Sequence, residues 1–228
     1  MKESISFQSP STYFLHEGKE NLRECIRISF EAAVTHDVKK LVIFTALGEG
    51  VKIAIQEFLP RPEFKGIVVV AVGFPDGRIP ESVSTEDLEL FRSSGVPFVR
   101  AHLPFDPIHG TFHERGTGQG LSLLGSVLEI FCGSMNLCVQ AALMACDAFA
   151  VEPGEHVISL TSDTSILVQA CPTCHFLTNF IVREVFCKPA LLTISKKEHR
   201  VDEDGEESEQ RQLSDTSKEL TDGQKSEA

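Results

Sequence analysis

The sequence predicts an α/β fold with a mostly parallel sheet, helices on both of its faces and an antiparallel edge. The first observation is the segment 41–58, where an apolar run typical of a buried strand leads through a glycine-containing loop into an amphipathic helical pattern. The second is that strand and helix patterns alternate through the first half of the chain. The third is that the last predicted strands cluster, which favours antiparallel pairing at one edge of the sheet.

The first half of the chain is predicted to alternate helices with strands. Apolar residues recur at helical spacing from Gly18 to Asp37. The strand 41–44 and the helix 51–58 follow, and two prolines after that helix end it. The glycine-bounded apolar run 66–72 predicts a second buried strand, and a third is expected at 96–101 after a short helix that Ser84 or Thr85 caps.

The second half begins with a long loop at 102–120. Loops of this length in compact domains are usually functional or disordered. Two helices are expected after it, and the second is apolar around most of its circumference, which predicts a central buried helix. Two short strands read as a pair across a turn, and a last strand precedes a proline. The predicted ranges are 121–132 and 135–150 for the helices, and 156–160, 166–170 and 181–186 for the strands.

Length and composition predict one soluble, cytoplasmic domain. The chain has 228 residues and 42% hydrophobic residues, no apolar run approaches the length that crosses a bilayer, and the start lacks a signal-peptide pattern. A net charge of −12 argues against a nucleic-acid partner held through phosphates. Seven cysteines, an odd number, favour reduced thiols over a disulfide framework.

The charge is concentrated at the end of the chain. Residues 196–228 contain eleven acidic and six basic residues and few apolar ones, a composition that predicts a disordered acidic tail, with or without a partner. The expected organisation is therefore an N-terminal extension at 1–11, an α/β domain at 12–195 and the tail at 196–228.

The segment from Cys171 to His175 matches the CxxCH pattern of covalent haem attachment. That chemistry belongs to exported proteins, so a structural turn is the preferred interpretation, with a redox pair or a metal site as the alternative. Three histidines, at positions 102, 109 and 113, have no helical spacing that would organise a metal site, and no metal ligand is assigned.

Three loops are candidate binding segments. Glu49, in the loop 45–50, suits ligand hydroxyls, such as those of a sugar chain, or a simple helix-capping role. The loop 115–120 combines Arg115 with glycines that let the backbone approach a phosphate, although a flexible loop is equally expected. The hydroxyl-rich segment 161–165 supplies either ligand contacts or ordinary turn residues.

Four segments together resemble a family of small prokaryotic proteins built like the C-terminal domain of pyruvate kinase. They are EGKENLRECIRISFEAA, LVIFTALGEGVKIAIQEF, MNLCVQAALMACDAFAVEPGEHVISL and VREVFCKPAL, and the resemblance covers roughly residues 12–192. It implies a three-layer α/β/α sandwich with a mixed sheet. In pyruvate kinase this domain is regulatory and binds a phosphorylated effector, so the resemblance implies ligand binding without pyruvate kinase activity, and flavin mononucleotide (FMN) is a candidate ligand.

The resemblance places the family's first binding loop at 45–50 and its later, glycine-rich loop at 161–165. Gly50 stands where the family tends to have a hydroxyl, and the segment 73–77 lacks the histidines expected in relatives. We therefore expect Glu49 and Thr45 to bind hydroxyls, while Arg115 and the 161–164 segment bind phosphate. The predicted ligand-binding set is Thr45, Gly48, Glu49, Gly50, His102, Arg115, Gly116, Thr117, Gly118, Thr161, Ser162, Asp163 and Thr164.

The favoured function is therefore binding of a small phosphorylated, nucleotide-like molecule, with no residue assigned to catalysis. One alternative is a flavin-dependent oxidoreductase that uses the 102–120 loop as a lid. The other is a structural or regulatory subunit of a homo-oligomer whose pocket has decayed.

Overall fold

A computed structural model describes residues 7–75, 82–105 and 119–190, and the side chains of 119–122 are excluded from the description. Its strands form one mixed sheet in the order β1-β7-β6-β5-β2-β3-β4. Every neighbouring pair is parallel except the two that involve β6. The strands are β1 (Thr12–Phe14), β2 (Lys40–Phe44), β3 (Val68–Gly73), β4 (Phe98–Arg100), β5 (His156–Leu160), β6 (Ser165–Gln169) and β7 (Ile181–Pro189).

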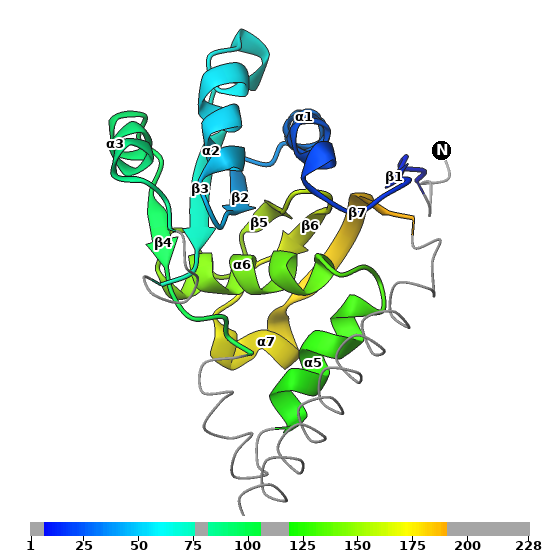
Figure 1. Cartoon of the computed structure of the whole chain (residues 1–228). Coiled ribbons are helices and arrows are strands. Elements are labelled where there is room, and N and C mark those ends of the chain that lie inside the picture. The colour runs from blue at the N-terminus through cyan, green and yellow to red at the C-terminus, as the bar shows by residue number, and fades with distance from the viewer. Residues whose placement is uncertain (1–6, 76–81, 106–118, 191–228) are drawn as a thin grey trace, which may run out of the picture. The chain divides into compact units, whose positions relative to one another are not determined.

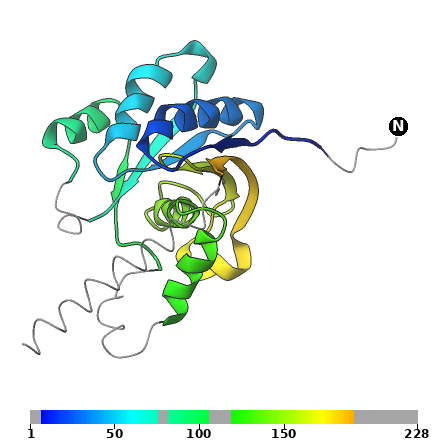
Figure 2. The same ribbon diagram turned by 45° about the vertical axis from the view of Figure 1, so that its right-hand side comes forward.

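Helices cover both faces of this sheet (Figures 1 and 2). One face carries the helices that connect the first four strands, and the other carries those that lead from β4 to β5 and from β6 to β7. The first layer contains α1 (Leu22–Thr35), α2 (Glu49–Ile53), which continues as the π-helical η2 (Ala54–Phe58), and α3 (Thr85–Ser93). The second contains α5 (Gln119–Glu129), α6 (Met135–Asp147) and α7 (Phe176–Asn179). The predicted α/β class and mostly parallel sheet are confirmed.

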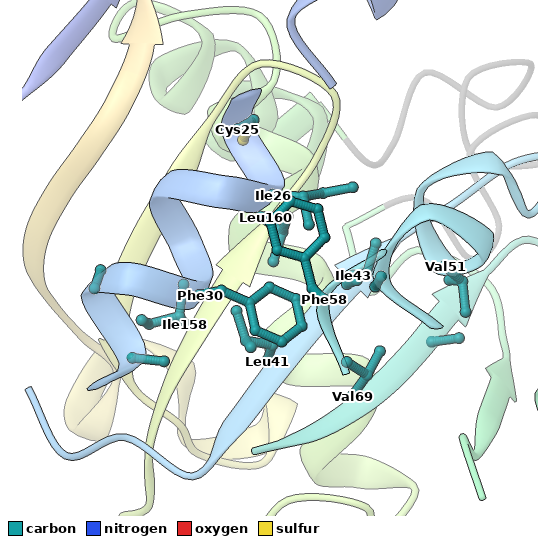
Figure 3. Close-up of a cluster of buried hydrophobic side chains, with 14 of the residues drawn as sticks. Cys25, Ile26, Phe30, Leu41, Ile43, Val51, Phe58, Val69, Ile158 and Leu160 are labelled. Carbon is teal, nitrogen blue, oxygen red and sulfur yellow. The ribbon is translucent and has the colours of Figure 1, made fainter. Parts of the chain in front are cut away.

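Two apolar clusters, one on each face of the sheet, make the core. Between the sheet and α1, the rings of Phe30 and Phe58 stack with centroids 5.1 Å apart, over Leu41 and Ile158 (Figure 3). On the other face, α6 is buried along its length against β2, β3 and β5. Because β2 is covered on both faces, its sequence is a continuous apolar run rather than an alternating one.

The pairing of β1, β7 and β6 includes features that the sequence did not predict. β1 is a three-residue edge strand that pairs with Cys187–Pro189, within the last strand, which extends three residues past its predicted end at Phe186. Two register shifts interrupt the β6–β7 pair. Short strands and bulges leave little periodicity in a sequence, so pattern analysis misses them.

Several predicted segments lie outside the described residues. They include part of the 102–120 loop and the acidic tail at 196–228. In the part of the chain that the structure describes, no helix combines the length and apolar character needed to cross a bilayer.

Candidate functional site

The point where the strand order reverses lies between β2 and β5. From β2 the chain continues through α2 to β3 on one side, whereas β5 is reached from β4 on the far side and leads away to β6. The two strands are parallel, and Ile43 pairs with Leu160 near their carboxyl ends. The loops that follow them, 45–48 and 161–164, therefore leave the same edge of the sheet at neighbouring positions. In α/β sheets this switch point is where ligands bind.

The 45–48 loop is held in a fixed conformation. Thr45 is buried, and its Oγ1 accepts a hydrogen bond of 2.8 Å from the N–H of Gly48. Gly48 has φ +93°, which strongly favours glycine at the position that begins α2. The end of β3 lies against this loop, because a Cβ on Gly73 would be 2.7 Å from the carbonyl oxygen of Thr45. Neighbouring strands thus fix the position of the Thr45 hydroxyl.

Glu49 and Gly50 face different surroundings at the start of α2. The Glu49 carboxylate is exposed and lies 3.3 Å from Nζ of Lys19, in the segment after β1. Gly50 is buried, and a Cβ there would approach Leu22 and Ile43 at 3.2 and 3.4 Å. Close packing of α2 against α1 and β2 therefore accounts for glycine at the position where the resemblance predicted a hydroxyl. Glu49 is the member of this pair that is accessible to a ligand.

The 161–164 turn is bonded mainly to the protein itself. Asp163 is buried and accepts hydrogen bonds from the N–H of Gly18 at 3.0 Å and from the hydroxyl of Thr164 at 3.2 Å. Thr161 and Thr164 are also buried, beside cysteine sulfurs. Ser162 is half-buried and is the residue of the four that is most open to solvent. The turn is thus built as a rigid support that presents one hydroxyl.

Buried thiols line the inner side of this turn. Cys132 lies 3.3 Å from the hydroxyl of Thr164, and Cys138, in the first turns of α6, contacts the hydroxyl of Thr161 and the carbonyl of Thr164. Burial raises the pKa of Cys138 well above its usual value and also raises the pKa of Cys132. Both sulfurs are therefore neutral thiols at physiological pH and act as packing groups rather than nucleophiles. Their contacts place the start of α6 at the same edge of the sheet.

The other predicted site residues are not gathered here by the described structure. His102 is exposed just after β4, two strands away from β2 in the sheet order. The loop residues Arg115, Gly116, Thr117 and Gly118 lie outside the described residues. In contrast, Gly18 and Lys19 do reach the site, although no sequence motif predicted them. Their loop follows β1, and the parallel pairing of β1 with β7 brings that loop to the site.

The CxxCH segment forms a short turn at the edge of the sheet opposite the 45–48 and 161–164 loops. Cys171 is buried and Cys174 is exposed, while Thr173 is held by two hydrogen bonds to the carboxylate of Asp147 at the end of α6. An open pocket of about 400 Å³ lies beside it, with Gly154, Cys171 and His175 in its lining. Among the described residues, no group of three histidine, cysteine or acidic side chains is placed to hold a metal ion. A structural role for the turn fits these contacts.

No model of a known protein family matches the chain. Kinship with the pyruvate kinase C-terminal domain stays a prediction.

Proposed function

We propose that the protein binds a small phosphorylated, nucleotide-like ligand at the carboxyl edge of the sheet, between β2 and β5. The observation that carries this proposal is the switch point itself, with two fixed loops leaving adjacent parallel strands. The resemblance to an effector-binding domain supports the same ligand class, with FMN as the first candidate.

The accessible groups at this edge divide by chemistry. The side chain of Glu49 is about half exposed and suits ligand hydroxyls. Lys19, beside it, carries a positive charge that suits a phosphate, and Ser162 offers a hydroxyl from the neighbouring turn. Lys19 and Glu49 lie side by side. A ligand with both hydroxyls and a phosphate therefore binds Glu49 through its hydroxyls and Lys19 through its phosphate.

Titration calorimetry with FMN, and separately with inorganic phosphate, tests the proposal. Lys19→Ala and Ser162→Ala are expected to weaken FMN binding, the former about tenfold or more because a charge-assisted contact is lost. Lys39→Ala is the matched control, since that exposed lysine precedes β2 at the opposite edge of the sheet. Equal affinity of the Lys19 and Lys39 variants would contradict this placement. Native mass spectrometry of the purified protein checks for a different bound phosphorylated molecule, and absence of both that mass and FMN binding overturns the proposed function.

A second candidate, a subunit of a homo-oligomer, is favoured by the outer face of α5 and the residues just after it. Four large apolar side chains, spaced four, three and one residue apart, are 45–68% exposed there: Leu123, Val127, Ile130 and Phe131. The helix also packs inward through Leu124 and Leu128. The helix α5 is therefore apolar on two faces, and only one of them is buried in this chain.

A second copy of the chain is the occupant proposed for this face. The chain carries a net charge of −12, so two copies repel each other except where a contact surface is uncharged. No described side chain on the exposed apolar face of α5 is ionised, and Glu129 turns toward Asn136 instead. The same acidic charge disfavours an anionic membrane as the partner.

Lys188 connects the end of this apolar surface to the edge strand β1. Lys188 donates a hydrogen bond of 2.8 Å to the carbonyl of Phe131, and its ammonium lies over the ring of Tyr13, which is 58% exposed. Light scattering after size exclusion is expected to give a dimer for the full chain and a monomer for Val127→Glu. The exposed Val34→Glu on α1 serves as a control and should remain dimeric. A monomeric full chain would reject this candidate.

A further inference from the structure

An open pocket of about 590 Å³ lies away from the switch point, between the end of α1 and the first half of β7. Its lining combines two apolar side chains, Phe7 and Ile181, with three titratable ones, His36, Arg183 and Glu184. Its volume falls in the range of pockets that hold small organic ligands. Since α1 contacts β7 in the packed domain, the walls come from two fixed elements and the segment before β1.

The carboxylate of Glu184 is an unsatisfied group in this pocket. Its side chain is 13% exposed, and Oε2 is buried without a hydrogen-bond partner among the described residues. The other oxygen, Oε1, lies 3.4 Å from Nδ1 of His36, whose ring packs on Phe186. A buried carboxylate oxygen without a donor is costly, so the Glu184 carboxylate has unused capacity to accept a hydrogen bond.

A β-bulge brings a positive charge into the same pocket. Consecutive residues of a regular strand point to opposite faces, yet Arg183 and Glu184 both line this pocket. The pairing explains this arrangement, because Leu167 pairs with Glu184 and Val168 with Val182, which leaves Arg183 as the extra residue. Bulges that redirect a side chain in this way are frequent next to binding sites.

The two opposite charges are not used to neutralise each other. Arg183 donates through Nη2 to the side-chain oxygen of Gln169 at 3.1 Å, while Oε2 of Glu184 accepts no hydrogen bond from the part of the chain that the structure describes. A pocket with a separate cation, a separate carboxylate and apolar walls matches a molecule that carries both charges and an apolar group. The end of α1, where His36 is the C-cap, adds the negative end of a helix dipole, which favours an ammonium group near Glu184.

We propose that this pocket binds a small apolar zwitterion of the α-amino acid class. The ligand's ammonium group donates to the carboxylate of Glu184, its own carboxylate accepts from Arg183, and its side chain covers Ile181 and Phe7. This site is separate from the phosphate site proposed at the switch point and does not depend on it.

Calorimetric titration with L-leucine and two analogues that each lack one charge tests the assignment. 4-Methylpentanoate lacks the ammonium group, and 3-methylbutylamine lacks the carboxylate. We expect L-leucine to bind saturably, with a dissociation constant of about 1 mM or lower, and each analogue to bind about tenfold more weakly. No saturable binding of L-leucine overturns the proposal.

Two variants separate a direct contact from a general structural effect. Glu184→Gln keeps the side-chain shape and should weaken L-leucine about tenfold while leaving 4-methylpentanoate unchanged. Arg183→Gln should weaken L-leucine and leave 3-methylbutylamine unchanged. Glu89→Gln and Arg92→Gln, which break an exposed ion pair on α3, are the matched controls. Equal losses for L-leucine and for both analogues in a variant would overturn the assigned contacts.

Discussion

The carboxylate of Asp163 accepts a hydrogen bond of 3.0 Å from the backbone N–H of Gly18, a residue 145 positions earlier in the chain. The bond joins the turn between β5 and β6 to the segment that leads from β1 into α1. Gly18 has φ +133°, a conformation that strongly favours glycine. The proposed phosphate site therefore rests on a contact between two loops that are distant in sequence.

Removal of this carboxylate should destabilise the fold. Asp163→Ala leaves the N–H of Gly18 and the hydroxyl of Thr164 without their acceptor in a buried site, so we expect the free energy of unfolding to fall by about 1–3 kcal/mol. Urea unfolding followed by circular dichroism measures the change. Glu89→Ala, at an exposed position on α3, should change it by no more than about 0.5 kcal/mol. An equally small effect at Asp163 would show that the bond contributes little.

Gly73 should tolerate no side chain. A Cβ there would lie 2.7 Å from the backbone oxygen of Thr45 and 3.0 Å from the ring of Phe98, and the backbone oxygen cannot turn aside. Gly73→Ala is expected to cost about 1–3 kcal/mol of stability through overpacking and to displace the Thr45 loop. The comparison is Gly133→Ala, where the nearest atom is 3.9 Å from the added Cβ. Thermal unfolding of the two variants should rank Gly73→Ala as clearly less stable.

Thiol titration should distinguish one cysteine from the other six. Cys174 is exposed, and Cys25, Cys132, Cys138, Cys146, Cys171 and Cys187 are buried. Ellman's reagent should therefore modify about one thiol per native chain quickly and the rest only after unfolding. Cys174→Ser should abolish the fast phase; a fast phase that survives this substitution would mean that a buried sulfur becomes accessible in solution.

Stability should decrease in alkaline solution. Burial raises the pKa of Cys25 and Cys138 well above the usual value and raises that of Cys146 to about 11. An unfolded thiol ionises near pH 8.5, so above that pH the unfolded chain binds fewer protons than the folded one. The buried thiols contribute their full stabilisation of the fold below about pH 8.5, and this stabilisation is lost as the pH rises toward their folded pKa values.

Urea unfolding under reducing conditions between pH 7.5 and pH 9.5 measures this loss. Cys138→Ala should flatten the pH dependence because it removes one buried thiol, and Cys174→Ser should leave it unchanged. A stability that stays constant across this range would contradict the assigned cause.

The parts of the fold with strong local periodicity were predictable. The apolar run of β2, the spacing of apolar residues in α1 and the nearly all-apolar α6 predicted an α/β domain with a mostly parallel sheet, and the structure confirms it. The predicted cap was also correct in kind, since the Ser84 hydroxyl accepts from the N–H of Asp87 at the start of α3. These features depend on residues close in sequence.

The edge of the sheet could not be predicted in the same way. β1 has three residues, and its place beside β7 depends on a partner more than 170 positions away. The bulge that puts Arg183 and Glu184 in one pocket is a matter of register between two strands, which no local pattern records.

The sequence by itself determined the class of fold, the order of its main elements and the loops that are candidates for a binding site. Only the tertiary structure decided how those loops are used: Gly50 serves helix packing, Asp163 serves a hydrogen bond to Gly18, and Lys19 comes to lie beside Glu49. The reason is physical. Secondary structure follows the spacing of apolar side chains along a few turns or residues, whereas a site is formed by groups that strand order and register bring together from distant parts of the chain.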